Sequence, residues 1–474
     1  MVSACAAWLD LPGAAGAGPR RETNPSWPSQ NRGMRASPGD YPPSWYALTR
    51  MSAEPRPGLA GPAKADVAIV GGGFAGLHLA RLLAKRGRRV AVLERQRIGW
   101  GASGRNGGFV SPGFAESSAS LVQRLGAQRA RALFAHSQAG VRLVEQAIAE
   151  LERPELTMGR GQLTCSRSAR GRGFADEVRA LAETLGASFE PWTAEQVQGA
   201  LATSRYHEAI HDPQAFQIHP LNLALALAAD IVARGGQVFE GTGVDTIARE
   251  RGAWVARTAQ GQVEAAELVL AGNADLGPLH RTLVRSVLPV ATYVAVTEPL
   301  GRALSDCVRW GGAVTDTRRA CDYFRVVDGD RLLWGGRITT DTREPRGLRE
   351  LMRRHIVAVF PQLAAVKIAH AWPGVMGYAR HKMPFIGQLE PGLWMSSAYG
   401  GHGVGQTAAG ALLLADAITE GDDEWRRYQA FPLRWAGGAA GRVATQAVYW
   451  WMQARDLWDE WRAPPKLGGG RRPG

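Results

Sequence analysis

Three glycines that follow a short apolar run have the spacing that suits a bound phosphate ester. The run covers residues 66–70, and Gly71, Gly73 and Gly76 follow it in the order Gly-x-Gly-x-x-Gly. The first glycine of such a turn permits a tight reversal, and the second lets the backbone approach a pyrophosphate. The third lets the next helix pack close to the strand. The segment is therefore a candidate pyrophosphate-binding turn.

An acidic residue stands where a dinucleotide site needs one. A second apolar run, residues 90–93, ends in Glu94, which lies 23 positions after Gly71. A carboxylate there can accept hydrogen bonds from ribose hydroxyls, while the N–H groups that open the intervening helix face the phosphates. A glycine motif alone is weak evidence in a chain with 58 glycines. Strand, glycine turn, helix, strand and acid in this order predict a bound adenine dinucleotide.

A second glycine-rich segment, residues 99–108, follows this unit. A mostly polar loop with so many glycines can pass close to a flat cofactor. The alternative is a surface loop. Because residues 99–108 come directly after the candidate ribose-binding residue Glu94, we favour a loop that contacts the cofactor.

Tyr323 and Arg325 belong to a predicted β-hairpin and could contact a substrate. Residues 323–327 and 331–336 are rich in strand-forming side chains and flank an Asp-Gly turn. A strand's period of two puts Tyr323 and Arg325 on one face. In one interpretation, the hairpin lies at the edge of a sheet and Arg325 is solvated. In the other, the hairpin forms a cavity wall, and the Arg325 guanidinium binds a substrate carboxylate. Both interpretations stay open.

His402 lies in a glycine-rich run, residues 400–405, that opens an apolar helix. The positive end of the helix dipole would stabilise negative charge on a ligand above it. His402 is a candidate proton-transfer residue, although a histidine in this setting is more often structural.

Apolar periodicity places these residues on helices and strands in alternation. It predicts the α/β fold class, with a Rossmann-type dinucleotide domain that is discontinuous in sequence and a second, β-sheet domain for the substrate. The predicted boundaries are 64–154, 210–285 and 376–432 for the dinucleotide domain, 155–209 and 286–375 for the substrate domain, and 433–465 for a C-terminal helical segment.

The two ends of the chain differ in character. Residues 1–60 are rich in Pro, Gly, Ala and Ser and predict a disordered extension, with Met34 and Met51 as other candidate start sites. The aromatic cluster at residues 41–46 could still pack on the body. In the C-terminal segment, apolar side chains recur at three- and four-residue intervals, and we expect this stripe to pack against the enzyme. The stripe consists of Val443, Ala447, Trp450, Ala454, Leu457 and Trp461.

Composition excludes several classes of protein. The net charge of +13 is spread along the chain, which argues against a nucleic-acid partner. No apolar run approaches the roughly 20 residues that span a bilayer. The four cysteines form no CxxC pair and no metal-ligand spacing, which favours a reducing, cytoplasmic location and predicts no metal.

These motifs together resemble the FAD-dependent amine and amino-acid oxidoreductases of the D-amino-acid oxidase and glycine oxidase superfamily. The likeness covers about residues 41–460. It rests on residues 66–94, 99–108, 219–225, 272–277, 297–301, 360–363 and 400–405.

The resemblance implies a glutathione-reductase-like FAD domain roofed by the substrate sheet. It assigns the cofactor contacts to Gly71, Gly72, Gly73, Phe74, Ala75, Gly76, Glu94, Arg95, Gly101, Ala102, Ser103, Arg105, Asn106, Gly107, Val244, Gly272, Gly401, Gly403, Val404 and Gly405. Some relatives attach the flavin covalently through a late cysteine or an early histidine. This chain has no cysteine between residues 374 and 387 and has Asn106 near the histidine position, so we expect non-covalent FAD.

The implied reaction is oxidation of the C–N bond of a primary or secondary amine to an imine, which hydrolyses to an aldehyde or keto acid. A carboxylate on the substrate would suit Arg325. The lysine that many oxidases place by the flavin cannot be matched, which leaves oxygen and another electron acceptor both open. The alternatives are a D-amino-acid or sarcosine-type dehydrogenase that reduces a quinone or carrier, and a basic flavin-dependent protein that modifies or binds nucleic acid.

Overall fold

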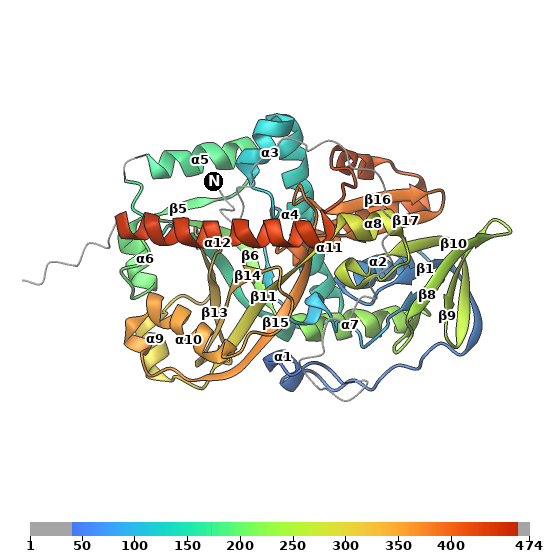
Figure 1. Cartoon of the computed structure of the whole chain (residues 1–474), viewed down its shortest axis with the longest axis horizontal. Helices are drawn as coiled ribbons and strands as arrows, with labels where there is room; N and C mark the ends of the chain where they lie inside the picture. Colours follow the sequence, from blue (N-terminus) through green and yellow to red (C-terminus); the bar gives the residue numbers. More distant parts are fainter. Residues whose placement is uncertain (1–39, 172, 463–474) are drawn as a thin grey trace, which may run out of the picture.

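Two β-sheets of different construction organise the computed structural model, which describes residues 40–171 and 173–462 (Figure 1). The first sheet has the strand order β16-β17-β10-β1-β2-β7, with β9 paired to β10 and β8 to β9. Its strands are β1 (Gly61–Val70), β2 (Val90–Leu93), β7 (Gln237–Phe239), β8 (Val244–Glu250), β9 (Ala253–Thr258), β10 (Gly261–Leu270), β16 (Phe385–Glu390) and β17 (Leu393–Ser397).

The centre of the first sheet is parallel and buried. β1 pairs in parallel with β10 on one side and with β2 on the other. Residues 67–70 and 90–93 are buried without alternation, as expected for strands covered on both faces. The strand that the sequence predicted to begin at Asp66 begins at Gly61. The Rossmann-type α/β unit is confirmed.

The second sheet is mainly antiparallel and has the order β15-β11-β14-β13-β12-β4-β6-β3, with β5 paired to β6. The predicted hairpin is present, with Tyr323 opposite Gly335. The strands are β3 (Phe109–Val110), β4 (Thr157–Cys165), β5 (Glu190–Trp192), β6 (Ala209–Ile218), β11 (Leu288–Thr297), β12 (Ala313–Asp316), β13 (Tyr323–Val327), β14 (Arg331–Thr339) and β15 (Ile368–Tyr378).

This strand pairing moves two predicted boundaries. Residues 109–110 and 210–218 were predicted to belong to the dinucleotide domain, but β3 pairs with β6, and β6 pairs with β4, in the second sheet. The sequence did not separate them because a strand's residue types do not indicate which sheet it joins. The other domain boundaries stay a prediction.

Helices cover both sheets. α2 packs against α7 and α11, and α11 also packs against α4, whereas α10 packs on β11, β14 and β15. The helices are α1 (Trp45–Leu48), α2 (Phe74–Lys85), α3 (Ser118–Leu125), α4 (Ala127–Glu150), α5 (Phe174–Leu185), α6 (Ala194–Ala200), α7 (Pro220–Ala233), α8 (Arg281–Ser286), α9 (Arg302–Cys307), α10 (Leu348–Val359), α11 (Gly403–Glu420) and α12 (Gly438–Arg462). Within the described ranges, none of them is long and apolar enough to cross a membrane.

The segment 40–60 is packed, which corrects the prediction of disorder for this part of the N-terminal extension. Tyr41 is buried and donates a hydrogen bond to the carbonyl of Ile98 at 2.8 Å. Tyr46 is fully buried, edge-on to the rings of His219 and Trp372. These aromatic side chains bury enough apolar area to order a segment whose average composition suggests none. Residues 1–39 lie outside the described part.

The C-terminal helix is present, but the predicted packing stripe faces the wrong way. Of that stripe, the side chains at positions 443, 447, 450, 454 and 457 are all exposed, while Trp461 lies beyond the described side chains. α12 packs on β11 and β14 through the opposite face, which carries Thr445, Tyr449, Met452 and Asp456. The sequence pattern identified an amphipathic helix and assigned its two faces in reverse.

A chain that begins at Met51 should fold poorly, whereas one that begins at Met34 should match the full chain. The shorter chain lacks Tyr46, and removing a buried aromatic ring costs about 3–5 kcal/mol of unfolding free energy. It also leaves Arg325 without its hydroxyl partner. Thermal unfolding of the two chains, each saturated with FAD, measures the difference. Equal melting temperatures would show that the packed arm adds nothing to stability.

Candidate active site

A cavity of about 550 Å³ lies where the two sheets meet. The first sheet contributes the turn after β1, residues 94–96 after β2, Val244 at the start of β8, and residues 271–277 after β10. The second sheet contributes Pro289 from β11 and Val375 and Met376 from β15. The segment that leads into α11 completes the wall with Ser396, Tyr399, Gly400, Gly401, Gly403 and Val404. The cavity is thus built from both sheets and from distant parts of the chain.

The glycine turn leaves no room for side chains. Gly71 has φ +116°, and a Cβ there would lie 2.8 Å from the carbonyl oxygen of Ala271. A Cβ on Gly76 would lie 2.1 Å from the carbonyl oxygen of Gly71, and one on Gly73 would lie 2.9 Å from Oγ of Ser103. The close packing of helix on strand that the motif predicts is therefore present.

Glu94 supports this turn from the end of β2. One carboxylate oxygen accepts the N–H of Gly72 at 2.7 Å, and the other accepts the N–H of Gln96 at 2.8 Å. Burial raises the pKa of Glu94, although the two N–H donors oppose that rise. The side chain also lines the cavity, so it can both hold the turn and accept a hydrogen bond from a ligand.

The glycine-rich loop 99–108 folds onto the start of α2. Oγ of Ser103 accepts the N–H of Phe74 at 2.9 Å. The Asn106 side chain donates to the carbonyl of Ser103 at 2.8 Å and accepts the N–H of Gly108 at 2.7 Å. These bonds fix the loop against the cavity, whose wall includes Ser103 and Asn106.

Arg105 of this loop is buried and supports it from behind. It donates to the carbonyls of Gly101 and Pro373, and its guanidinium lies 4.8 Å from the centroid of the Trp100 ring. Burial lowers the pKa of Arg105 to about 10, so it remains protonated at neutral pH. Arg105 therefore links the loop to β15 rather than to the cavity.

The predicted cofactor residues fall into two groups. Those that line the cavity are Gly71, Gly73, Phe74, Ala75, Glu94, Arg95, Gly101, Ala102, Ser103, Asn106, Val244, Gly272, Gly401, Gly403 and Val404. Those that stand behind its wall are Gly72, Gly76, Arg105, Gly107 and Gly405.

Arg325 does not reach the cavity, which corrects its predicted role as the carboxylate clamp. Only 2% of its surface is exposed. Its guanidinium donates to the carbonyl of Ile218 at 2.8 Å and to the hydroxyl of Tyr46 at 3.1 Å. Tyr323 lies on the same side of β13, with its ring over Gly335 and against Gly107. Together the two side chains support the loop 99–108 and tie it to α1.

His402 is the residue before α11 and is absent from the cavity wall. Burial lowers its pKa to about 4, so it is neutral at pH 7. A neutral imidazole next to the helix start adds no unfavourable positive charge to the positive end of the α11 dipole. This position favours the structural interpretation over proton transfer.

Several lining residues were not singled out from the sequence. The hydroxyls of Tyr399 and Ser396 lie 2.7 Å apart, and burial raises the pKa of Tyr399. Their only sequence signal is their place between the end of β17 and the glycine run before α11. The residues missed in this way include Thr242, Pro289, Val375, Met376, Ser396, Tyr399 and Thr407.

Comparison with known proteins identifies the family of this chain. The family model DAO, described as FAD dependent oxidoreductase, matches residues 66–417. The chain belongs to this family. Gamma-glutamylputrescine oxidoreductase of Escherichia coli is 33% identical over 405 residues, which cover 83% of this chain and 92% of the relative. A Haemophilus influenzae protein named "Probable oxidoreductase OrdL" is 32% identical over 367 residues, 76% of this chain and 84% of the relative.

The fold agrees with that of a solved relative. The crystal structure of glycine oxidase from Geobacillus kaustophilus matches with a TM-score of 0.65 at 23% identity, over 78% of this chain and 99% of that one. The resemblance inferred from the sequence is therefore confirmed, and the protein is an FAD-dependent oxidoreductase. The glycine cradle at residues 71–76, which no side chain could enter, fits the pyrophosphate of this cofactor.

Gly76→Ala should prevent FAD retention and lower the free energy of unfolding by about 3 kcal/mol, because the new methyl group meets a backbone oxygen that cannot move alone. Gly199→Ala in α6 is the matched control, since a Cβ there meets nothing within 4 Å. Flavin absorbance after gel filtration and chemical unfolding of both variants test this. Normal FAD content in Gly76→Ala would refute the close-packing argument.

Acid should destabilise the protein in part through His402. Its pKa is about 4 in the fold, below the ordinary value of 6.5, so the unfolded chain binds more protons between these pH values. The stability it supports is complete above pH 6.5 and is lost as pH falls through 4. His402→Asn should therefore lose less melting temperature than the parent between pH 7.5 and 5. The partly exposed His207→Asn is the control. Equal losses in parent and His402→Asn would contradict the assignment.

Proposed function

We propose that this enzyme oxidises the C–N bond of a primary or secondary amine to an imine, which hydrolyses to an aldehyde or keto acid. The observation that carries the proposal is the shared cavity: the dinucleotide turn forms one part of its wall, and two strands of the second sheet form another. A substrate held under the second sheet would therefore share a closed space with the cofactor. The name of the E. coli relative, gamma-glutamylputrescine oxidoreductase, supports an amine of polyamine catabolism as substrate.

The residues that would hold FAD are those of the cavity wall. The backbone of residues 71–75 would face the pyrophosphate at the start of α2, Glu94 would accept from ribose hydroxyls, and Val244 would lie against adenine. The N-terminal end of α11 would face the ring system with its positive dipole. When bound, FAD supplies a two-electron acceptor. We expect it to be non-covalent.

At the substrate end, the chain's own residues orient the amine and keep water away. In the described part of the chain, the second sheet contributes Pro289, Val375 and Met376 to the wall, and none of these can accept a proton. We therefore propose that the amine binds already deprotonated. It loses two electrons and two protons, one from the α-carbon and one from nitrogen, and water then hydrolyses the imine.

Oxygen is the proposed electron acceptor, which would yield hydrogen peroxide. A D-amino-acid or sarcosine-type dehydrogenase that reduces a quinone or carrier is the alternative, because the cavity wall does not indicate an acceptor. Since Arg325 lies outside the cavity, a substrate carboxylate would need another partner. Arg95 lines the cavity, but its guanidinium donates to the carbonyl of Asp275 beside Glu94, at the proposed ribose end.

If no protein group deprotonates the amine, the pH dependence should follow the substrate. The rate constant for anaerobic bleaching of the flavin, at low amine concentration, should rise about tenfold per pH unit up to the pKa of the amine and then level off. Two amines with different pKa values should give two different midpoints. Stopped-flow absorbance measures both.

A common midpoint for both amines would reveal a base in the protein and contradict the mechanism. Peroxide and dye-reduction assays on the same panel, extended to D-amino acids and N-methyl amino acids, separate the oxygen-dependent oxidase from the dehydrogenase. A protein that no amine bleaches but that retains RNA in a salt-sensitive manner would instead favour the nucleic-acid alternative.

A further inference from the structure

Helix α12 presents an apolar face to solvent. Val443 is 72% exposed, Trp450 62% and Leu457 66%, and these side chains lie on one side of the helix. Trp451 and Trp458 flank them and are about half exposed. In Figure 1, α12 runs across the second sheet along the long axis of the molecule. A contiguous apolar surface of this kind on a soluble domain marks an interaction site.

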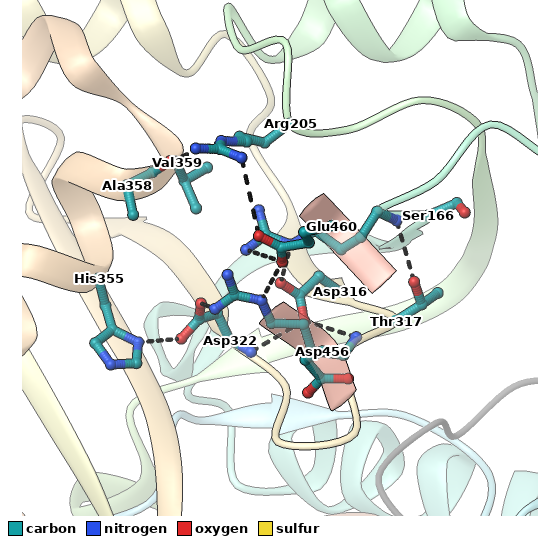
Figure 2. A network of polar contacts seen from close by, with 12 residues as sticks. Ser166, Arg205, Asp316, Thr317, Asp322, His355, Ala358, Val359, Asp456 and Glu460 are labelled. Atoms are coloured by element: carbon teal, nitrogen blue, oxygen red, sulfur yellow. Dashed lines mark hydrogen bonds and ion pairs between the residues drawn. The ribbon is translucent and has the colours of Figure 1, made fainter. Parts of the chain in front are cut away.

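Buried ion pairs fix this orientation. Asp456 accepts the backbone N–H of Arg319 at 3.1 Å and its guanidinium at 2.7 Å. Glu460 forms ion pairs with Arg318 at 2.8 Å and with Arg167 at 3.2 Å. Figure 2 shows Glu460 pointing into a polar network that also contains Asp316 and Asp322, with Asp456 on the same helix. Turning the apolar face inward would break these pairs and leave buried charges alone, which is strongly unfavourable.

The inward face is also fixed at the other end of the helix. Oε1 of Gln446 accepts from the hydroxyl of Thr339 at the end of β14 and from the N–H of Thr340, which follows that strand. Tyr449 and Met452 pack on Leu288 and Val290 of β11. The helix is held along its whole length, so its outer face is a rigid surface.

The outer face has the pattern of a helix–helix seam. Its residues are spaced by four, three, four and three positions, which is the a/d spacing of a coiled coil. Large and small side chains alternate along it, in the order Val443, Ala447, Trp450, Ala454 and Leu457. A large side chain next to a small one leaves a hollow that another large side chain can fill.

We propose that this seam binds α12 of a second copy of the chain, antiparallel and around a two-fold axis. In such a pair, Trp450 of one copy lies against Ala454 of the other, and Leu457 lies against Ala447. Both contacts fit a single register, because 450 and 454 have the same midpoint as 447 and 457. Trp450 and Leu457 then each meet an alanine, which makes this part of the surface self-complementary, as a two-fold interface requires.

Charge supports a second copy over a lipid surface. The N-terminal half of α12 carries Arg442, and its C-terminal end carries the exposed Asp459. Antiparallel pairing brings these opposite charges, and the opposite helix dipoles, toward each other. A helix that lies on a membrane needs a cationic border. Here Asp459 is exposed beside Trp458, and Arg455 lies within 3.9 Å of it.

Sedimentation equilibrium of the FAD-loaded full chain tests the proposal. We expect a mass of 102 kDa, twice the 51.0 kDa of one chain. Trp450→Glu/Leu457→Glu should give a monomer with unchanged melting temperature and FAD content. A parent that stays monomeric at concentrations far above micromolar, or a dimer that survives both glutamates, would overturn the proposal.

A swap of large and small residues tests the register. Trp450→Ala should open a hollow and Ala454→Trp should create a clash, and each alone should raise the dissociation constant roughly thirtyfold or more. Trp450→Ala/Ala454→Trp exchanges the two partners at the same contact and should restore dimerisation. Failure of this rescue in a folded protein would exclude the proposed register.

Sedimentation with lipid vesicles tests the alternative that a membrane covers the apolar face. The parent should not sediment with vesicles of phosphatidylglycerol and phosphatidylcholine. Monomers that bind these vesicles, and that lose binding with Trp450→Glu/Leu457→Glu, would show that lipid rather than a second copy covers the face.

Discussion

The backbone contact between Gly71 and Gly76 is the constraint on which the active site depends. It sets how closely α2 approaches β1, and so where the first N–H groups of that helix point. Glu94 and Ser103 then complete the arrangement, one by holding the turn and the other by accepting the N–H of Phe74. Gly71 also lies against the residue that follows β10, because a Cβ on Gly71 would lie 2.8 Å from the carbonyl oxygen of Ala271. Three cavity walls thus meet at one turn.

Local sequence patterns were sufficient to predict a structural feature wherever that feature depends on residues close together in the sequence. The glycine turn, Glu94 and the hairpin at residues 323–336 each depend on contacts within a short stretch, or on a period that the strand imposes. The family resemblance extended this to Val244, Gly401, Gly403 and Val404, which line the cavity. For these parts, the local sequence was enough to predict where the residues lie.

The predictions that were wrong concern residues whose surroundings come from distant segments. Arg325 shares a face with Tyr323 as expected, yet Tyr46, nearly 280 positions earlier, supplies a hydroxyl that accepts a hydrogen bond from its guanidinium. No pattern around Arg325 could indicate that partner. The same holds for α12: an amphipathic helix normally buries its apolar side, but ion pairs from Arg167, Arg318 and Arg319 favour the polar side here. Buried charge networks of this kind reverse the usual rule and are not visible in periodicity.

The wall of the cavity draws on residues from 40 to 407, in separated stretches of the chain. During synthesis, the turn at residues 71–76 therefore leaves the ribosome long before the segment that faces it, residues 396–404. A nascent chain can form the first strands and helix of the dinucleotide unit, but the cavity wall is incomplete until residues 396–407 have also been made. We therefore expect stable FAD binding only after residues 396–404 have been synthesised. A prematurely terminated product would carry the nucleotide fingerprint and yet remain colourless.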